Sequence, residues 1–216
     1  MGETGTKRGR PRGFDRAAAL EAATRLFWAH GYGATSIGEL TGAMGIRPGS
    51  LYAAFGDKES LFREVVQNYG RSSAGGFIGV ALREERTARG AVARILREAA
   101  VVYSDPSHPA GCLTISAATN VTPQDAAIEA FLRDLRTEGL AAMEARLRKA
   151  REDGELPADT DPRSLAAYFA AVVQGMSQRA RDGATAAELT STAELAMKAW
   201  PAPDTGSSED STLATG

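Results

Sequence analysis

The sequence predicts an all-α protein in which a head of three short helices precedes a larger helical domain. Apolar residues recur with the 3.6-residue period of a helix along almost the whole chain, and no segment shows a convincing strand pattern. Glycines and a proline interrupt this period closely between residues 31 and 56, which predicts short helices there. With 216 residues, 43% of them hydrophobic, and no apolar run near the roughly 18 residues of a membrane span, the chain can bury one or two cores.

Charge is distributed unevenly along the chain. The net charge is −2, but residues 1–63 hold nine Lys and Arg against six Asp and Glu, so the N-terminal part of the chain carries the positive excess. The run KRGRPRGFDR overlaps an arm, residues 1–13, that we expect to be disordered; it could follow a phosphate backbone or be only a solvated tail. One cysteine, and no apolar stretch after the basic residues, predict a reducing, cytoplasmic location without a membrane partner.

Two helices are predicted before residue 45. The first ends at Gly31, and the second runs from Ile37 to Met44. Ser36 and Glu39 have the spacing of a capping box before the second helix, and Gly45 permits a left-handed turn after it. The apolar face of the first helix is formed by residues three or four apart: Ala19, Ala22, Ala23, Leu26, Phe27 and His30.

A third short helix is predicted directly after the glycine turn. Pro48 suits a first helical turn, and Leu51 and Phe55 form the buried side. Two helices this short must brace against the first one, which predicts a helix-turn-helix whose last helix could enter a major groove. An ordinary helical hairpin is the alternative. The residues expected to be exposed on the last helix are Arg47, Gly49, Ser50, Tyr52, Ala53 and Ala54.

The residues around this turn carry a family resemblance. The run GYGATSIGELTGAMGIRPGSLYAAFGDKESLF resembles the DNA-binding segment of the tetracycline-repressor (TetR) family of bacterial transcriptional regulators, over about residues 14–63. The resemblance implies an N-terminal helix-turn-helix DNA-binding head and a C-terminal helical ligand-binding and dimerisation domain. Since a homodimer presents two heads related by a two-fold axis, we expect it to bind a palindromic double-stranded DNA operator and to respond to a small-molecule effector. We expect a repressor rather than an activator, because the fold can occlude a promoter and shows no evident element that contacts the polymerase.

The resemblance also implies roles for single residues in DNA binding. Thr35 and Ser36 would contact phosphate, while Tyr52 and Lys58 would hold the DNA backbone. The residues that would face the groove are Arg47, Pro48, Gly49 and Ser50. Some relatives have bulky polar residues where this chain has Ala53 and Ala54, so we expect Arg47, together with the basic arm, to carry more of the specificity, with thymine methyl contacts by the alanines.

The rest of the chain is predicted to form a second, helical domain. Asp57 caps a helix that continues through Tyr69, and a hinge or a plain loop is expected between Gly70 and Gly76. The domain boundaries predicted are 14–60 for the head, 61–200 for the second domain and 201–216 for a disordered acidic tail. Further helices are expected at 88–104, 112–119, 123–153, 162–182 and 186–200.

The last two predicted helices are the candidates for a dimer interface. Apolar stripes run along 162–182 and 186–200, with small residues between them that allow close packing. These stripes could equally form the core of a single chain, and the resemblance favours a homodimer. Their residues are Leu165, Phe169, Val172, Val173, Met176 and Ala180, then Leu189, Ala193, Ala196, Met197 and Trp200.

An effector cavity is expected in the second domain. Its candidate lining consists of bulky or sulfur-containing residues: Phe77, Tyr103, Cys112, Phe131, Met143, Tyr168 and Met176. Cys112 follows a Pro/Gly loop at a predicted helix start, a setting that suits a thiol that senses electrophiles or oxidants, whereas its apolar neighbours favour an ordinary buried cysteine.

Catalytic chemistry has little support in the sequence. It contains no phosphate-binding glycine loop after a strand, no metal-ligand spacing and no nucleophile with a histidine partner, so we expect neither an enzyme nor a cofactor. A second hypothesis stays open, in which a helical dimer binds a small molecule or a protein while its helix-turn-helix is degenerate and no longer binds DNA.

Overall fold

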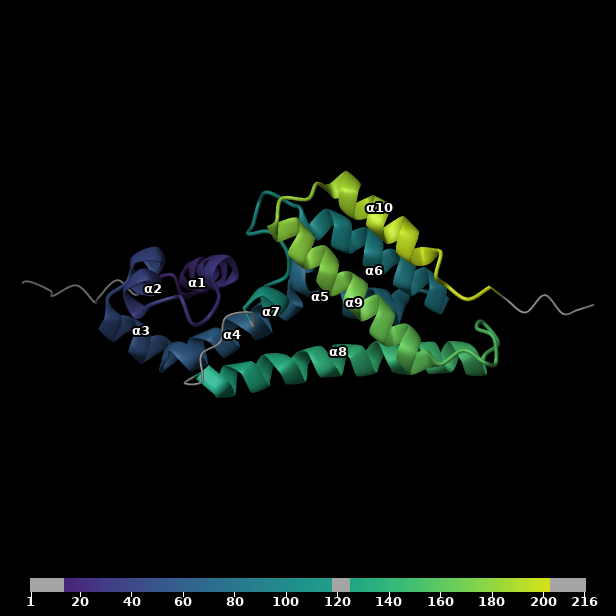
Figure 1. The fold of residues 1–216 in the computed structure, drawn as a ribbon. Helices are drawn as coiled ribbons and strands as arrows, with labels where there is room; N and C mark the ends of the chain where they lie inside the picture. Colours follow the sequence, from purple (N-terminus) through teal and green to yellow (C-terminus); the bar gives the residue numbers. More distant parts are fainter. Residues whose placement is uncertain (1–13, 118–124, 203–216) are drawn as a thin grey trace, which may run out of the picture. The chain divides into compact units, whose positions relative to one another are not determined.

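The computed structural model describes residues 14–117 and 125–202, and within these residues all regular structure is helical (Figure 1). None of these helices is both long enough and apolar enough to span a membrane. The helices are α1 (Arg16–His30), α2 (Ile37–Met44), α3 (Pro48–Phe55), α4 (Lys58–Arg71), α5 (Ser73–Glu84), α6 (Ala88–Tyr103), α7 (Leu113–Ser116), α8 (Ala126–Glu152), α9 (Pro162–Arg181) and α10 (Ala186–Met197). The all-α prediction is confirmed for the described part of the chain.

The chain folds into two compact units. The first unit contains the described residues up to Gly76 and, in addition, 105–117 and 125–133; the second contains 77–104 and 134–202. Residues 61–76 thus lie in the first unit, beyond the boundary predicted at residue 60. The predicted arm, the helix start at Pro123 and the tail from residue 203 lie outside the described residues.

The first three helices form as the local signals predict. α1 begins three residues earlier than its apolar stripe because the Asp15 carboxylate accepts hydrogen bonds from Ala17 N, at 2.9 Å, and Ala18 N, at 3.1 Å. α1 packs against α2 and α4, and the ring of Phe62 lies edge-on to that of Phe27, with centroids 5.0 Å apart. His30 is exposed, which corrects its placement on the apolar face.

The segment predicted as a hinge or loop is a break of one residue between two helices. α4 ends at Arg71 and α5 begins at Ser73, so that Ser72 alone separates them. The sequence did not predict α5, since its first turns contain the glycines that suggested a loop. The chain turns so tightly here that a Cβ atom at Gly75 would lie 2.2 Å from the carbonyl oxygen of Tyr69.

In the second unit, α6, α9 and α10 pack against one another. Predicted N-caps are confirmed at Asp161 and in a full capping box formed by Thr185 and Glu188. The stripes predicted for a dimer interface mostly face this core: Phe169 is fully buried, and Leu189 is 1% exposed. The single-chain reading of these stripes is therefore correct, because α6 supplies the apolar surface that we had assigned to a second copy.

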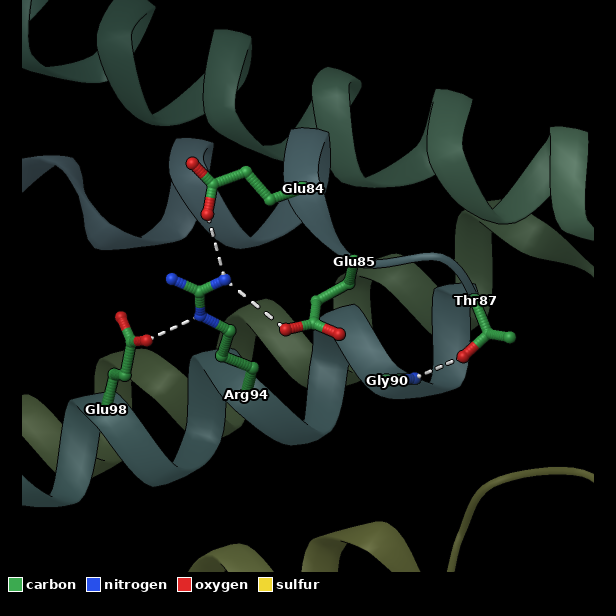
Figure 2. Close-up of polar contacts among 6 residues, drawn as sticks. All are labelled: Glu84, Glu85, Thr87, Gly90, Arg94 and Glu98. Atoms are coloured by element: carbon green, nitrogen blue, oxygen red, sulfur yellow. Dashed lines mark hydrogen bonds and ion pairs between the residues drawn. The ribbon is translucent and has the colours of Figure 1, made fainter.

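A charged cluster joins the end of α5 to α6 within the second unit. Figure 2 shows the Arg94 guanidinium between three carboxylates, at 2.6 Å from Glu98, 3.1 Å from Glu84 and 3.3 Å from Glu85. Hydrogen bonding to Glu98 and Glu84 raises the pKa of Arg94. Next to this cluster the Thr87 hydroxyl accepts a hydrogen bond from Gly90 N and caps α6.

Candidate nucleic-acid interface

The turn between α2 and α3 has the backbone geometry that its residues favour. Gly45 adopts the left-handed conformation, with φ 66°, and Ile46 N donates to Thr41 O at 3.1 Å, which ends α2 in a Schellman motif. Arg47 is extended and precedes Pro48, the first residue of α3. Two helices therefore follow one another across a turn of three residues.

One side of α3 is core and the other is free for a partner. Leu51 is fully buried and Phe55 is 6% exposed, so both anchor the helix in the first unit. Tyr52 is 50% exposed and is one of the few large apolar side chains at the surface of the described residues. The other exposed residues are Arg47, Pro48, Gly49 and Ala53, whereas Ser50 and Ala54 are half-buried.

The start of α2 has a closed capping box. Ser36 Oγ accepts a hydrogen bond from Glu39 N at 3.2 Å, and the Glu39 carboxylate accepts from the backbone N and the hydroxyl of Ser36, each at 2.7 Å. These hydrogen bonds from Ser36 hold the pKa of Glu39 below its ordinary value. Ser36 is exposed, so it stays a candidate for a phosphate contact.

Thr35 is placed differently from the prediction. Its side chain is 1% exposed, and its hydroxyl donates to the carbonyl oxygen of Gly31 at 2.7 Å. This burial argues against a phosphate contact by the Thr35 side chain. The residue instead braces the loop that connects α1 to α2.

Lys58, at the start of α4, lies against an aromatic ring. Its ammonium is 4.2 Å from the ring centroid of Tyr32, a cation–π distance. Burial lowers the pKa of Lys58, while Asp125 and Glu39 act in the opposite direction. The ammonium is half-buried, and its role on a DNA backbone stays a prediction.

One residue that contacts the candidate interface was missed in the sequence. The Arg16 guanidinium pairs with the Glu64 carboxylate through two nitrogens, at 2.6 and 2.7 Å, and lies 4.5 Å above the ring centroid of Phe55. Arg16 and Glu64 are 48 positions apart, so no local pattern could have connected them.

The seven candidate effector residues are divided between the two units. Cys112 and Phe131 belong to the first unit, and Tyr168 is 41% exposed on α9. Phe77 and Tyr103 lie edge-to-face with centroids 5.8 Å apart, and Met143 and Met176 are likewise buried residues of the second unit. No observation tests the seven residues as effector contacts, so all of them stay predictions for an effector site.

Cys112 lies in a buried part of the first unit and is 8% exposed. Its sulfur accepts a hydrogen bond from the Tyr69 hydroxyl at 3.5 Å and lies 3.2 Å from the Thr114 hydroxyl. Such burial is typical of a cysteine that serves as a small apolar residue. Among residues 14–117 and 125–202, no group of three His, Cys, Asp or Glu could hold a metal ion.

The turn after α2, the half-exposed helix α3 that follows it and the helical second unit together define a helix-turn-helix transcriptional regulator. The profile for bacterial regulatory proteins of the tetR family matches residues 19–65, and the profile for the tetracyclin repressor-like C-terminal domain matches residues 88–196. The chain therefore belongs to the tetR family of bacterial regulatory proteins, which is a family of regulators and not of enzymes.

Individual relatives resemble the chain over most of its length. The HTH-type transcriptional repressor ComR of Escherichia coli K12 is 35% identical over 194 residues, which cover 90% of this chain and 92% of that protein. The repressor BdcR of the same strain is 32% identical, with 88% and 91% covered. A cysteine variant of the TetR family regulator CifR, solved with a 26-bp double-strand operator DNA, is 41% identical, with a TM-score of 0.84, and the match covers 89% of this chain and all of that one.

Proposed function

We propose that the protein is a repressor that binds a palindromic DNA operator as a homodimer and responds to a small molecule bound in the second unit. The observation that carries the proposal is the split surface of α3, where Leu51 and Phe55 are buried while Arg47, Gly49 and Tyr52 are exposed. A helix anchored in this way can enter a major groove with its free side. ComR and BdcR are transcriptional repressors, and the CifR variant was solved with operator DNA, which supports this proposal.

Selection of bound sequences from a random DNA pool by the full-length protein tests the proposal. Enrichment of a sequence with two inverted half-sites, about 34–36 Å or a multiple of that distance apart, is the expected result. Failure to enrich any sequence at low salt would instead favour the hypothesis that the helix-turn-helix has lost its DNA.

Arg47 is the residue whose removal should relax base readout. We expect Arg47→Ala to lower affinity for the selected operator by about tenfold or more, because a bidentate contact to a base contributes roughly 1–3 kcal/mol. Affinity for a scrambled duplex should change little. Fluorescence anisotropy with both duplexes measures the difference.

A matched control is Arg71→Ala, which removes the same charge from the last turn of α4, where the side chain is exposed. Equal losses on the selected and scrambled duplexes would show that Arg47 contacts phosphate instead of a base.

The dimer is proposed through the exposed faces of α9 and α10, since their predicted stripes are buried within the chain. Tyr168 on α9 is 41% exposed and Leu195 on α10 is 62% exposed. The two helices form an antiparallel hairpin in which the Phe169 and Trp200 rings lie 6.0 Å apart, so Tyr168 and Leu195 lie near the same end.

Whether the effector releases the DNA or promotes its binding follows from titration of the DNA complex with candidate effectors.

A further inference from the structure

The helix α3, proposed above to enter the major groove, is contacted at its C-terminal end by one side chain from α1. Arg16 reaches α3 in two ways: its guanidinium lies over the Phe55 ring, at 4.5 Å, and its Nη2 is 3.4 Å from the carbonyl oxygen of Ala54. The same guanidinium pairs with both carboxylate oxygens of Glu64 on α4. Arg16 therefore connects three helices.

The position of α3 depends on such outside contacts. The helix has eight residues, too few to be stable alone, and its side-chain anchors in the core are Leu51 and Phe55. Arg16 covers the Phe55 ring and places a cation at the carbonyl end of the helix, where positive charge is favourable. The bidentate pair with Glu64 favours one orientation of the guanidinium, although the Arg16 side chain is 51% exposed.

We propose that Arg16 is a positioning residue, which sets the orientation of α3 for sequence-specific DNA readout through its contacts with Glu64 and Phe55. The inference rests on the proposed function. Arg16 lies outside residues 19–65, the segment that the family profile matches, so the role is assigned from the contacts in this chain.

A phosphate contact is the competing role for an arginine next to a DNA-binding helix. Both terminal nitrogens of Arg16 already bind the Glu64 carboxylate, at 2.6 and 2.7 Å. A phosphate would have to displace that carboxylate or share the guanidinium with it. The geometry therefore favours positioning over phosphate binding.

The test compares full-length variants on the operator selected by the wild type and on a scrambled duplex of equal length. The variants are Arg16→Gln, Glu64→Gln and the exchanged pair Arg16→Glu with Glu64→Arg. Arg71→Gln serves as the control, since it removes one exposed cation at the C-terminal end of α4, seven residues after Glu64. Dissociation constants are measured at several salt concentrations, and circular dichroism confirms that each variant is folded at the assay temperature.

We expect Arg16→Gln to weaken operator binding by about five- to tenfold, the size of an ion pair combined with a cation–π contact, and Glu64→Gln, which removes only the ion pair, by about two- to fivefold. The exchanged pair should recover part of this loss. Binding to the scrambled duplex and the slope of log Kd against log salt should match those of Arg71→Gln, because a positioning residue neutralises no phosphate. Loss of operator preference in Glu64→Gln is especially informative, since a carboxylate itself has no affinity for DNA.

Two results would overturn the inference. If Arg16→Gln weakens both duplexes equally and reduces the salt slope by about one, while Glu64→Gln does not weaken binding, Arg16 is a phosphate contact. If both variants equal Arg71→Gln on the operator, the cluster does not position α3. A wild-type protein that enriches no sequence would refute the proposed function first, and the inference with it, before any variant is compared.

Discussion

At the scale of single residues, Gly75 has no room for a side chain. We expect Gly75→Ala to destabilise the first unit by about 1–3 kcal/mol, because its Cβ atom would lie 2.2 Å from the Tyr69 carbonyl oxygen and the backbone would have to shift. Thermal unfolding followed by circular dichroism measures the change.

The matched control is Gly70→Ala, five residues earlier, where an added Cβ atom meets nothing within 4 Å. Alanine there should be neutral or stabilise α4 by up to about 1 kcal/mol. Equal melting temperatures for the two variants would contradict the close approach at Gly75.

Asp161 gives a residue-scale prediction about pH. Its carboxylate accepts hydrogen bonds from Ser164 Oγ, at 2.6 Å, and from Arg163 N, at 3.1 Å, and these bonds lower its pKa below the ordinary 3.8. A lowered folded-state pKa means that the carboxylate stabilises α9 at pH values above the unfolded pKa. That contribution is lost as the pH falls through the folded-state pKa.

We therefore expect Asp161→Asn to melt a few degrees below the wild type at pH 7, with the difference shrinking below about pH 4. Asp159→Asn is the control, since that exposed carboxylate lies two residues before the N-cap. A difference between Asp161→Asn and wild type that stays constant from pH 7 to pH 3 would contradict the assignment.

At the scale of helices, local signals explain what the sequence could predict. The caps at Ser36 and Thr185 and the turn at Gly45 act within a few residues, so α2, α10 and the helix-turn-helix were predicted close to their observed bounds. α5 was missed because Gly75 and Gly76 resemble a loop, although the close approach of α4 and α5 is what requires them.

The candidate site residues could likewise be predicted only where signals within a few residues decide their exposure. The helical spacing around Leu51 and Phe55 decides which side of α3 is exposed, so most of its exposed residues could be predicted. The burial of Thr35 depends on the loop that it braces, and the contact of Arg16 with Glu64 depends on how α1 and α4 pack. Periodicity along 162–182 marked an apolar face correctly but could not show that α6 covers it.

At the scale of the whole molecule, the proposed dimer gives a direct prediction. Leu195→Glu should shift the protein from twice the chain mass of 22.7 kDa toward one chain, because a charge in an apolar interface must be desolvated. Leu195 is 62% exposed in the single chain, so its replacement should leave the fold intact. Light scattering coupled to size-exclusion chromatography measures the mass.

Val101→Glu is the matched control, since Val101 is 64% exposed but lies on α6. Dissociation by Val101→Glu together with an intact Leu195→Glu dimer would place the interface on α6 instead of α10.

The packing of Trp28 has a consequence for the order in which the chain folds. Trp28 on α1 stacks on His108, with ring centroids 4.4 Å apart, and the Arg25 side chain donates to Ser107 O at 2.8 Å. These partners are synthesised some eighty residues after α1, so the packing around Trp28 can be completed only after they have emerged. During translation, a nascent chain that has emerged only as far as α5 therefore already contains the Tyr69 ring that packs edge-on against the indole, but it still lacks the His108 ring that stacks on it.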